Sequence, residues 1–197
     1  MQQLIGHTNW VRSVAFSHDG IYIVSGSDDQ SVRIWNASSG AELQKLNGHN
    51  NHVNSVAFSN DGIHIVSGSS DNSVRLWDAS TGAALQQLNG HTGWVTFSHE
   101  GIHIVSGSYD KSVRVWDVST GAVLQQLNGH TDHVNSIAFS RNGIHIVSGS
   151  YDKSVRVWDV STGAELQQLN GHTDYVNSIA FSRNGIHIVS DSYDKSV

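Results

Sequence analysis

The apolar residues of this chain fall into short segments of six or seven residues, which turn-forming residues separate. In one period the segments are residues 53–59 (VNSVAFS), 63–69 (IHIVSGS), 73–78 (SVRLWD) and 83–88 (AALQQL). They are rich in Val, Ile, Trp and Phe, and they end at Gly, Asn, Asp or Ser, which is typical of β-strands joined by tight turns. No segment keeps a helical period over 11 residues. The pattern predicts an all-β protein in which each period forms one small, twisted sheet of four antiparallel strands.

The same period recurs along the whole chain. A Gly-His pair occurs five times, at spacings of 42, 42, 39 and 42 residues, with its histidine at His7, His49, His91, His130 and His172. A Trp-Asn or Trp-Asp pair lies within four of the periods, at Trp35, Trp77, Trp116 and Trp158. A fixed period of this length indicates one supersecondary unit that buries its apolar surface only by stacking on its neighbours. We therefore expect residues 1–197 to form a single repeat domain.

Composition narrows the classes of partner. The net charge is −6 and the isoelectric point is about 6.1, so the chain has no basic field to attract nucleic acid. Cysteine is absent, which excludes disulfides and cysteine-based zinc sites. The N-terminus does not resemble a signal peptide, and no run of about 18 apolar residues predicts a membrane span. We expect a cytoplasmic protein that needs no cofactor and binds neither nucleic acid nor membrane.

The recurring residues resemble those of the WD-repeat β-propeller family over essentially the whole chain. Gly-His, a Ser-Gly-Ser-x-Asp turn and Trp-Asp follow one another in the family's order and at its period. The resemblance implies a β-propeller of four-stranded antiparallel blades. Residues 1–4 (MQQL) resemble the fourth strand of the other periods, and the last period reaches only its third strand. We expect about five blades, four of them complete and the fifth shared between the two ends of the chain, because closure removes exposed sheet edges.

In this family, four side chains in each blade form a hydrogen-bonded network. By motif position, the resemblance assigns it in the first four repeats to His7, Ser25, Asp29 and Trp35; to His49, Ser67, Asp71 and Trp77; to His91, Ser106, Asp110 and Trp116; and to His130, Ser148, Asp152 and Trp158. The fifth repeat supplies His172, Ser190 and Asp194 without a tryptophan. A Ser-His-Asp set also suggests a hydrolase. Five buried copies suit architecture better than catalysis, which needs one exposed nucleophile, and no Gly-x-Ser-x-Gly motif is present.

The repeats are nearly identical. Residues 130–155 and 172–197 differ only at His133/Tyr175 and Gly149/Asp191. Such uniform repeats resemble the sensor propellers of fungal and bacterial signalling NTPases of the NACHT class. The 197 residues contain no Gly-x-x-x-x-Gly-Lys-Ser/Thr motif, so we expect no NTPase domain among them.

Positions that vary between near-identical copies are candidates for a binding surface. Three residues after the five histidines stand Trp10, His52, Trp94, His133 and Tyr175. Two positions further on stand Arg12, Asn54, Asn135 and Asn177. Immediately before the turn aspartates stand Asp28, Ser70, Tyr109, Tyr151 and Tyr193. In the family these positions surround the mouth of the central channel and often contact partners. Tyr, Trp, Arg and Asn are frequent on protein-recognition surfaces, so we expect a protein or peptide ligand here. The alternative is that the first set only packs against its own strand.

The third repeat is three residues shorter than its neighbours, in the segment His91 to Phe97. Side chains alternate between the two faces of a strand, so a shift by an odd number of residues would turn each of them to the opposite face. The strand avoids this if residues 95–97 take the places of residues 137–139. Trp94 is then expected in the loop before the strand.

The sequence thus predicts a non-catalytic scaffold or sensor. Alternatives are a structural array that oligomerises with other copies through an incomplete last blade, and, more distantly, a carbohydrate binder or enzyme. Four further histidines recur at one equivalent position of the second strand, at His64, His103, His145 and His187. We do not expect them to bind a metal ion, because neighbouring blades place equivalent residues too far apart to share one.

Overall fold

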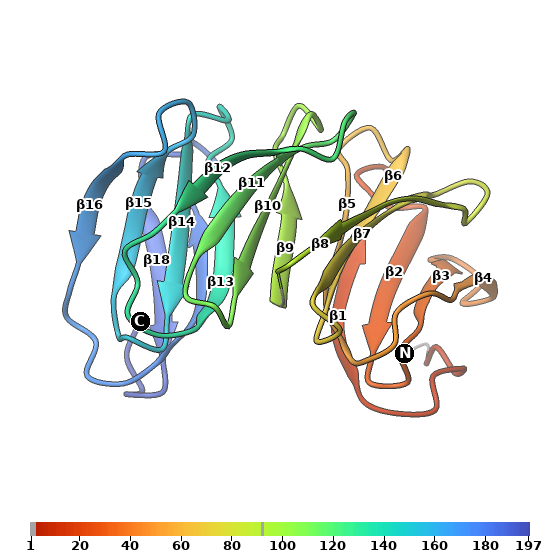
Figure 1. Ribbon diagram of the computed structural model, residues 1–197. Helices are drawn as coiled ribbons and strands as arrows, with labels where there is room; N and C mark the ends of the chain where they lie inside the picture. Colours follow the sequence, from red (N-terminus) through yellow and green to blue (C-terminus); the bar gives the residue numbers. More distant parts are fainter. Residues whose placement is uncertain (1–2, 92) are drawn as a thin grey trace. The chain divides into compact units, whose positions relative to one another are not determined.

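A computed structural model describes residues 3–91 and 93–197, and these residues form strands and turns but no helix (Figure 1). The chain divides into two compact units, Met1–Val95 and Thr96–Val197, each of which is described by itself. The boundary between them falls inside strand β9 (Gly93–Phe97). The prediction of an all-β protein is confirmed.

The first unit contains two four-stranded antiparallel sheets, each in simple sequence order. The first sheet consists of β1 (Val11–Phe16), β2 (Tyr22–Ser27), β3 (Val32–Asn36) and β4 (Glu42–Leu46). The second consists of β5 (Val53–Phe58), β6 (His64–Ser69), β7 (Ser73–Asp78) and β8 (Ala84–Asn89). Strands β5 to β8 match the four segments expected from the apolar pattern of this period to within a residue or two.

The second unit repeats the arrangement. One sheet has the order β12-β11-β10-β9, with β10 (His103–Ser108), β11 (Val113–Asp117) and β12 (Val123–Leu127). The next contains β13 (Val134–Phe139), β14 (His145–Ser150), β15 (Val155–Asp159) and β16 (Glu165–Leu169). The last sheet has two strands, β17 (Val176–Phe181) and β18 (Ile188–Ser192).

The proposed sharing of a fifth blade stays a prediction. Gln3 and Leu4 lie in no strand, and Met1 and Gln2 lie outside the described residues. The sheets of four antiparallel strands are confirmed, while the number of blades is not established.

Each sheet buries its apolar side chains against the next sheet of the same unit. Val53 and Val56 of β5 are buried in a cluster with Val24 and Ile34 of the first sheet. They pack over Gly26 of β2, where an added Cβ would lie 2.6 Å from Cγ1 of Val53. That spacing is shorter than van der Waals contact, so a residue without a side chain is required for the sheets to approach.

Strand β9 corrects one expectation. Trp94 lies inside this strand, so its predicted displacement into the loop is wrong. The amide of Val95 donates to Ser55 Oγ at 3.2 Å, as the amide of Val56 donates to Ser13 Oγ at 3.2 Å, so Val95 keeps the expected place. Trp94 therefore stands at the register position that Ser55 holds in the repeat before it.

The deletion is absorbed by glycine backbone. Gly90 and Gly93, which lie in the shortened segment or beside it, adopt φ values of 93° and 132°, a conformation that favours glycine. The Gly93 carbonyl fills the space that a valine side chain fills at the equivalent joint, because an added Cβ on Gly68 would lie 2.3 Å from it.

Candidate functional site

The four-residue network assigned from the resemblance is a continuous chain of hydrogen bonds in the second repeat. Trp77 Nε1 donates to Ser67 Oγ at 2.8 Å, and Ser67 Oγ lies 2.7 Å from His49 Nε2. His49 Nδ1 lies 2.8 Å from Asp71 Oδ2. An ionised carboxylate only accepts, so Nδ1 carries the proton and the Nε2 of a neutral ring accepts from the serine hydroxyl. Every polar atom along this line has a partner in a buried environment.

The first and fourth repeats have the same geometry. Trp35 and Trp158 donate to Ser25 and Ser148 at 2.8 Å, and these hydroxyls lie 2.7 Å from the histidines. The histidine–aspartate distances are 2.9 and 2.8 Å, for His7–Asp29 and His130–Asp152.

The third and fifth repeats contain parts of the same network. Trp116 donates to Ser106 at 2.8 Å, while His91, which belongs to the first unit, is buried. In the fifth repeat His172 lies 2.9 Å from Ser190 and 3.0 Å from Asp194. Its serine has no tryptophan donor in this sequence.

The aspartates of the network are held ionised. For Asp71, burial alone raises the pKa, but hydrogen bonds from Ser73, the Asn50 amide and His49 outweigh it and leave the pKa below its ordinary value. Burial lowers the pKa of His49 below 6.5, which keeps the ring neutral near pH 7. The same balance keeps the pKa of Asp29, which takes the place of Asp71 in the first repeat, well below its ordinary value.

This arrangement does not suit nucleophilic catalysis. Ser67 and Ser148 are fully buried, and their hydroxyls already accept from a tryptophan and face a histidine. A substrate carbonyl has no path to them, so the network stabilises the blade.

A fifth member of the network was missed in the sequence. Ser73 Oγ donates to Asp71 Oδ1 at 2.6 Å, and equivalent serines do so in the other repeats at 2.6–2.7 Å. The signal was a serine two residues after each turn aspartate, at Ser31, Ser73, Ser112, Ser154 and Ser196.

The variable positions of a repeat are neighbours across its first two strands. The amide of the residue before the turn aspartate donates to the carbonyl of the residue immediately before strand one. The pairs are Asp28 with Trp10, Ser70 with His52, Tyr151 with His133 and Tyr193 with Tyr175, at 2.9–3.1 Å. In these four repeats, positions 18 residues apart therefore present one local surface.

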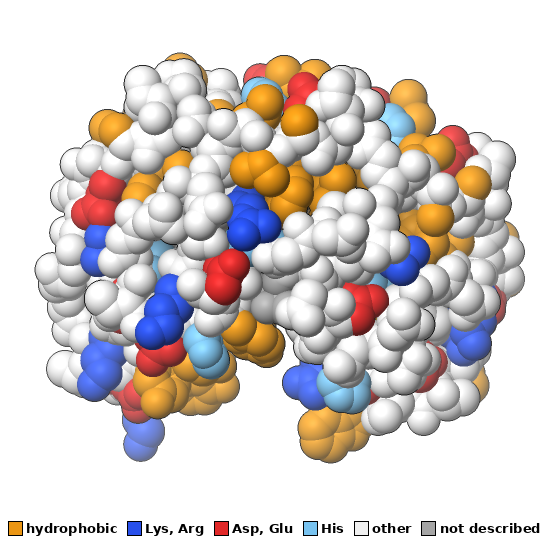
Figure 2. Space-filling view, in the orientation of Figure 1, with side chains coloured by type: hydrophobic (Ala, Val, Ile, Leu, Met, Phe, Trp, Pro, Cys, Tyr) orange, Lys and Arg blue, Asp and Glu red, His pale blue; other side chains and the backbone are white. Residues whose placement is uncertain are grey.

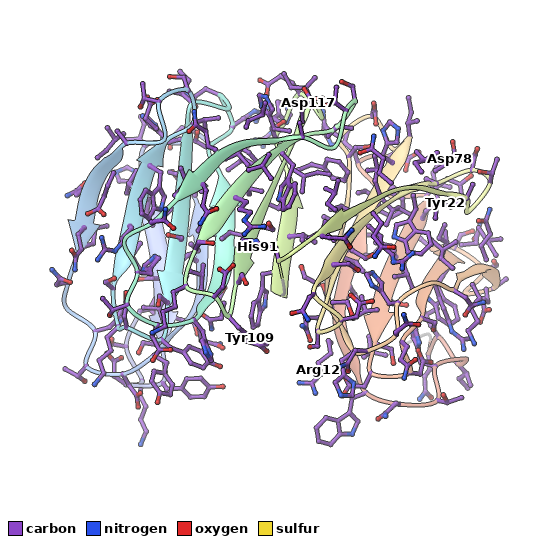
Figure 3. The ribbon with its side chains drawn as sticks, in the orientation of Figure 1. Arg12, Tyr22, Asp78, His91, Tyr109 and Asp117 are labelled. Atoms are coloured by element: carbon purple, nitrogen blue, oxygen red, sulfur yellow. The ribbon has the colours of Figure 1, made fainter. Side chains whose placement is uncertain are left out.

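In the second unit these local surfaces join into a row of rings. Tyr109 lies 4.8 Å from His133, His133 lies 5.8 Å from Tyr151, and Tyr151 lies 4.4 Å from Tyr175, centroid to centroid. Tyr193 follows, bonded through its amide to Tyr175. We call these five residues the aromatic row. Figure 3 labels Tyr109 at the end of β10, and Figure 2 shows hydrophobic side chains gathered beside a histidine at this edge.

Burial and nearby tyrosines raise the pKa of Tyr151, so its phenol is neutral and can donate a hydrogen bond. Tyr109, Tyr175 and Tyr193 are exposed, while His133 and Tyr151 are half-buried between them. The row thus offers ring faces and hydroxyls to solvent.

In the first unit the same positions carry charge instead. Arg12 Nε and Nη2 donate to the two Asp28 carboxylate oxygens at 2.7 and 2.8 Å, and His52 Nδ1 lies 3.2 Å from Asp28 Oδ1. Trp10 lies 5.7 Å from the Arg12 guanidinium and is exposed. The hydrogen bond from Arg12 lowers the pKa of Asp28. We call Trp10, Arg12, Asp28 and His52 the charged cluster.

Among the remaining predicted positions, Asn54, Ser70 and Trp94 are half-buried and Asn135 is buried, whereas Asn177 is exposed. Asn54 Nδ2 donates to Ser70 Oγ at 3.0 Å, and Asn177 Nδ2 donates to Asp191 Oδ2 at 3.2 Å. Asn135 is buried, with its Nδ2 at 3.5 Å from the Asn177 carbonyl. Trp94 is half-buried inside β9. Asn54, Ser70, Trp94 and Asn135 thus support the surface more than they form it, while Asn177 is open to solvent.

The opposite ends of the strands carry Asx turns and shallow pockets. Asp117 and Asp78 begin such turns, at the ends of β11 and β7 away from Tyr109 and Arg12 in their respective units (Figure 3). An open pocket of about 380 Å³ in the second unit is lined by three phenylalanines, two arginines and His99, among other residues.

Residues 3–91 and 93–197 contain no group of three acidic or histidine side chains that could hold a metal ion. The same residues form no helix long and apolar enough to cross a membrane.

Several curated proteins match one repeat of the chain. A nuclear distribution protein PAC1-2 of Uncinocarpus reesii is 50% identical over 42 residues, which are 21% of this chain and 9% of that protein. A nuclear distribution protein nudF of Aspergillus niger is 42% identical over 45 residues, 23% and 10% respectively. The vegetative incompatibility protein HET-E-1 of Podospora anserina is 54% identical over 39 residues, 20% and 3%. The matches thus span about a tenth or less of each relative's length.

The model of the WD domain, G-beta repeat matches residues 1–36, 40–78, 82–117, 121–159 and 163–197. These five matches cover nearly the whole chain and confirm the resemblance drawn from the Gly-His and Trp-Asp pairs. Repeats of this kind commonly mediate interactions between proteins. The chain belongs to the WD-repeat (WD40) family.

Proposed function

We propose that the chain is a non-catalytic recognition module that binds a protein or peptide on the surface where the first strands of its repeats begin. The aromatic row carries this proposal. Rings from three near-identical repeats line up at distances of 4.4–5.8 Å, and all of them stand at positions where the repeats differ. Exposed aromatic side chains in a preformed row offer large contact area at small entropic cost.

The charged cluster gives the first unit a different preference. Arg12 remains 44% exposed while its partner Asp28 is nearly buried, so a ligand meets an arginine already held in place. Trp10 beside it supplies an apolar face. We propose that the charged cluster favours a polar ligand segment, whereas the aromatic row favours an aromatic or apolar one.

A peptide library displayed on phage and selected against the whole chain supplies defined ligands for a test. Binding of the selected peptides is then measured for the variant Tyr109→Ala/Tyr151→Ala/Tyr193→Ala. We expect at least about a tenfold loss of affinity, because residues of this type dominate interface energies. Thermal melts check that the variant is folded.

Tyr22→Ala is the matched control, because Tyr22 is also partly exposed but lies outside the aromatic row. Equal affinity of the wild type and the triple variant for every selected peptide would refute the proposed site.

The domain organisation is part of the proposal. We propose that residues 1–197 form one propeller domain with repeats beginning near His7, His49, His91, His130 and His172, and that the last, truncated blade is shared between the two ends of the chain. The expected cytoplasmic location also stays a prediction.

The main alternative is a structural array in which the open edge of β18 pairs with another copy. Sedimentation at rising concentration distinguishes it from a recognition module that acts alone. The more distant alternative, a carbohydrate binder or an enzyme, would use a concave surface such as the pocket lined by Arg141 and Arg183. Soaks with sugars, metals and ester substrates test that alternative.

A further inference from the structure

Three of the joints between neighbouring sheets share one arrangement. A valine from the first strand of one sheet sits over a glycine in the second strand of the sheet before it. An added Cβ would lie 2.6 Å from Val53 Cγ1 at Gly26, 2.7 Å from Val134 Cγ1 at Gly107 and 2.7 Å from Val176 Cγ1 at Gly149. All three valines are fully buried. The joint therefore depends on a residue without a side chain.

In the fifth repeat that position is Asp191. Ser178 pairs with Asp191 between β17 and β18, as Ser136 pairs with Gly149 between β13 and β14, so the register is the same. The two repeats are otherwise identical over residues 130–155 and 172–197 except at His133/Tyr175. The change at the joint position thus stands in an almost unchanged background.

The Asp191 side chain occupies the surface that a following sheet would cover. It is half-buried and accepts a hydrogen bond from Asn177 Nδ2 at 3.2 Å. A valine packed against this position, as Val176 packs against Gly149, would overlap the Cβ of Asp191. It would also remove the Asp191 carboxylate from water. Burying a charge against an apolar side chain is strongly unfavourable.

The complementary half of such a joint is exposed on β1. Val11 and Val14 stand at the positions of Val53 and Val56, and they are 49% and 66% exposed, against 0% and 5% for their counterparts. Phe16 of the same strand is 65% exposed. In chains with near-identical repeats, such a face fits the glycine-bearing sheet of another copy.

We propose that Asp191 blocks head-to-tail association of copies of this chain, by filling the place that a valine of the next blade takes at the other joints. The occupant that it excludes is the β1 face of a second copy. This joint is distinct from strand pairing along the edge of β18, which involves backbone groups rather than the face that carries Asp191.

Sedimentation velocity of the full chain over a range of concentrations tests the proposal with Asp191→Gly, which restores the residue of Gly149. We expect the association constant to rise roughly 100-fold or more over the wild type, with species beyond the 21.4 kDa of one copy. Adding Val14→Asp should abolish that rise, because it places a charge on the opposing face. Thermal melts confirm that each variant is folded.

Asp191→Ala separates the effect of the side chain's Cβ from that of its charge. Because even a Cβ lies too close at this joint, this variant should associate no more than the wild type. Any of three results would overturn the proposal. In the first, Asp191→Gly associates no more strongly than the wild type. In the second, Asp191→Ala associates as strongly as Asp191→Gly. In the third, the wild-type chain already associates and loses this association on Val14→Asp.

Discussion

The rings of Tyr151 and Tyr175 stack at a centroid distance of 4.4 Å with an interplanar angle of 14°. Tyr151 precedes the turn aspartate of the fourth repeat, whereas Tyr175 stands at the start of the first strand of the fifth. Stacking between these positions joins the local surfaces of two repeats into one. The row exists because each repeat places these two positions side by side.

A double-mutant cycle of Tyr151→Ala and Tyr175→Ala should show coupling. We expect an interaction free energy of about 0.5–1.5 kcal/mol in the free energy of unfolding, since stacked aromatic pairs contribute this much beyond their buried area. Urea unfolding of the four proteins measures it. As a control, the effects of Tyr151→Ala and Tyr22→Ala on the free energy of unfolding should be additive, because Tyr22 lies in the other unit. An interaction free energy between Tyr151 and Tyr175 that is no larger than the experimental error would contradict the stack.

Removing the central hydroxyl of one network should cost more than removing its counterpart in the fifth repeat. Ser67→Ala leaves the Trp77 N–H and His49 Nε2 without their partner in a buried place. We expect a loss of about 1–3 kcal/mol in the free energy of unfolding, the usual penalty for a buried unsatisfied group. Ser190→Ala, where no tryptophan donates, should lose clearly less. Chemical denaturation of both variants decides the comparison.

Acid should weaken the Asx turns that follow the third strands. Hydrogen bonds from the Ser80 hydroxyl and the Thr81 amide and hydroxyl lower the pKa of Asp78 to about 2. The folded pKa lies below the ordinary 3.8, so the stabilisation is complete above about pH 4 and is lost as the pH falls through 2. Asp117 and Asp159 behave alike, each with a pKa of about 2.

The first repeat provides the control for this prediction. Asn36 accepts the same set of bonds from Ser38 and Ser39 without titrating. The variant Asp78→Asn/Asp117→Asn/Asp159→Asn should therefore lose less stability than the wild type between pH 4 and pH 2, measured by thermal melts. An unchanged slope with pH would show that other groups govern acid unfolding.

Glycine should be favoured immediately after the turn aspartates. Gln30, Asn72, Lys111, Lys153 and Lys195 adopt φ values of 67–74° there. This left-handed conformation costs a residue with a side chain about 1–2 kcal/mol. Lys111→Gly should raise the free energy of unfolding by about 0.5–1 kcal/mol, after allowing for glycine's greater freedom in the unfolded chain.

The matched change Lys45→Gly, inside strand β4, should instead lower stability by about 0.5–1 kcal/mol. Denaturant midpoints of the two variants should move in opposite directions, and a shift of both in the same direction would contradict the strain at Lys111.

Much of the fold followed from local chemistry. The short alternating segments with Gly, Asn and Asp between them predicted strands β5 to β8, because strand formation and tight turns depend on neighbouring residues. The Gly-His and Trp-Asp pairs and their spacing also lie within single repeats, so their resemblance to the WD-repeat family could be seen in the sequence. The third repeat was harder to predict, because Gly93 backbone replaces a side chain there, and a carbonyl leaves no signal in residue type.

The candidate surface divides in the same way. Comparison of near-identical repeats identified Tyr109, Tyr151 and Tyr175 as variable positions, and that required the sequence alone. Whether these rings stack, and whether Arg12 binds Asp28 or solvent, depended on contacts between residues far apart in the chain.

The sequence by itself determined the strands and the repeat, and the resemblance of its motifs identified most residues of each hydrogen-bonded network, since these are set by patterns that recur within about 42 residues. Only the tertiary structure decided which variable side chains meet. It also revealed that Gly149 lies under a buried valine and that Asp191 therefore changes a joint. The physical reason is that packing between sheets is a matter of a few ångströms between atoms of different repeats, a distance that no local pattern encodes.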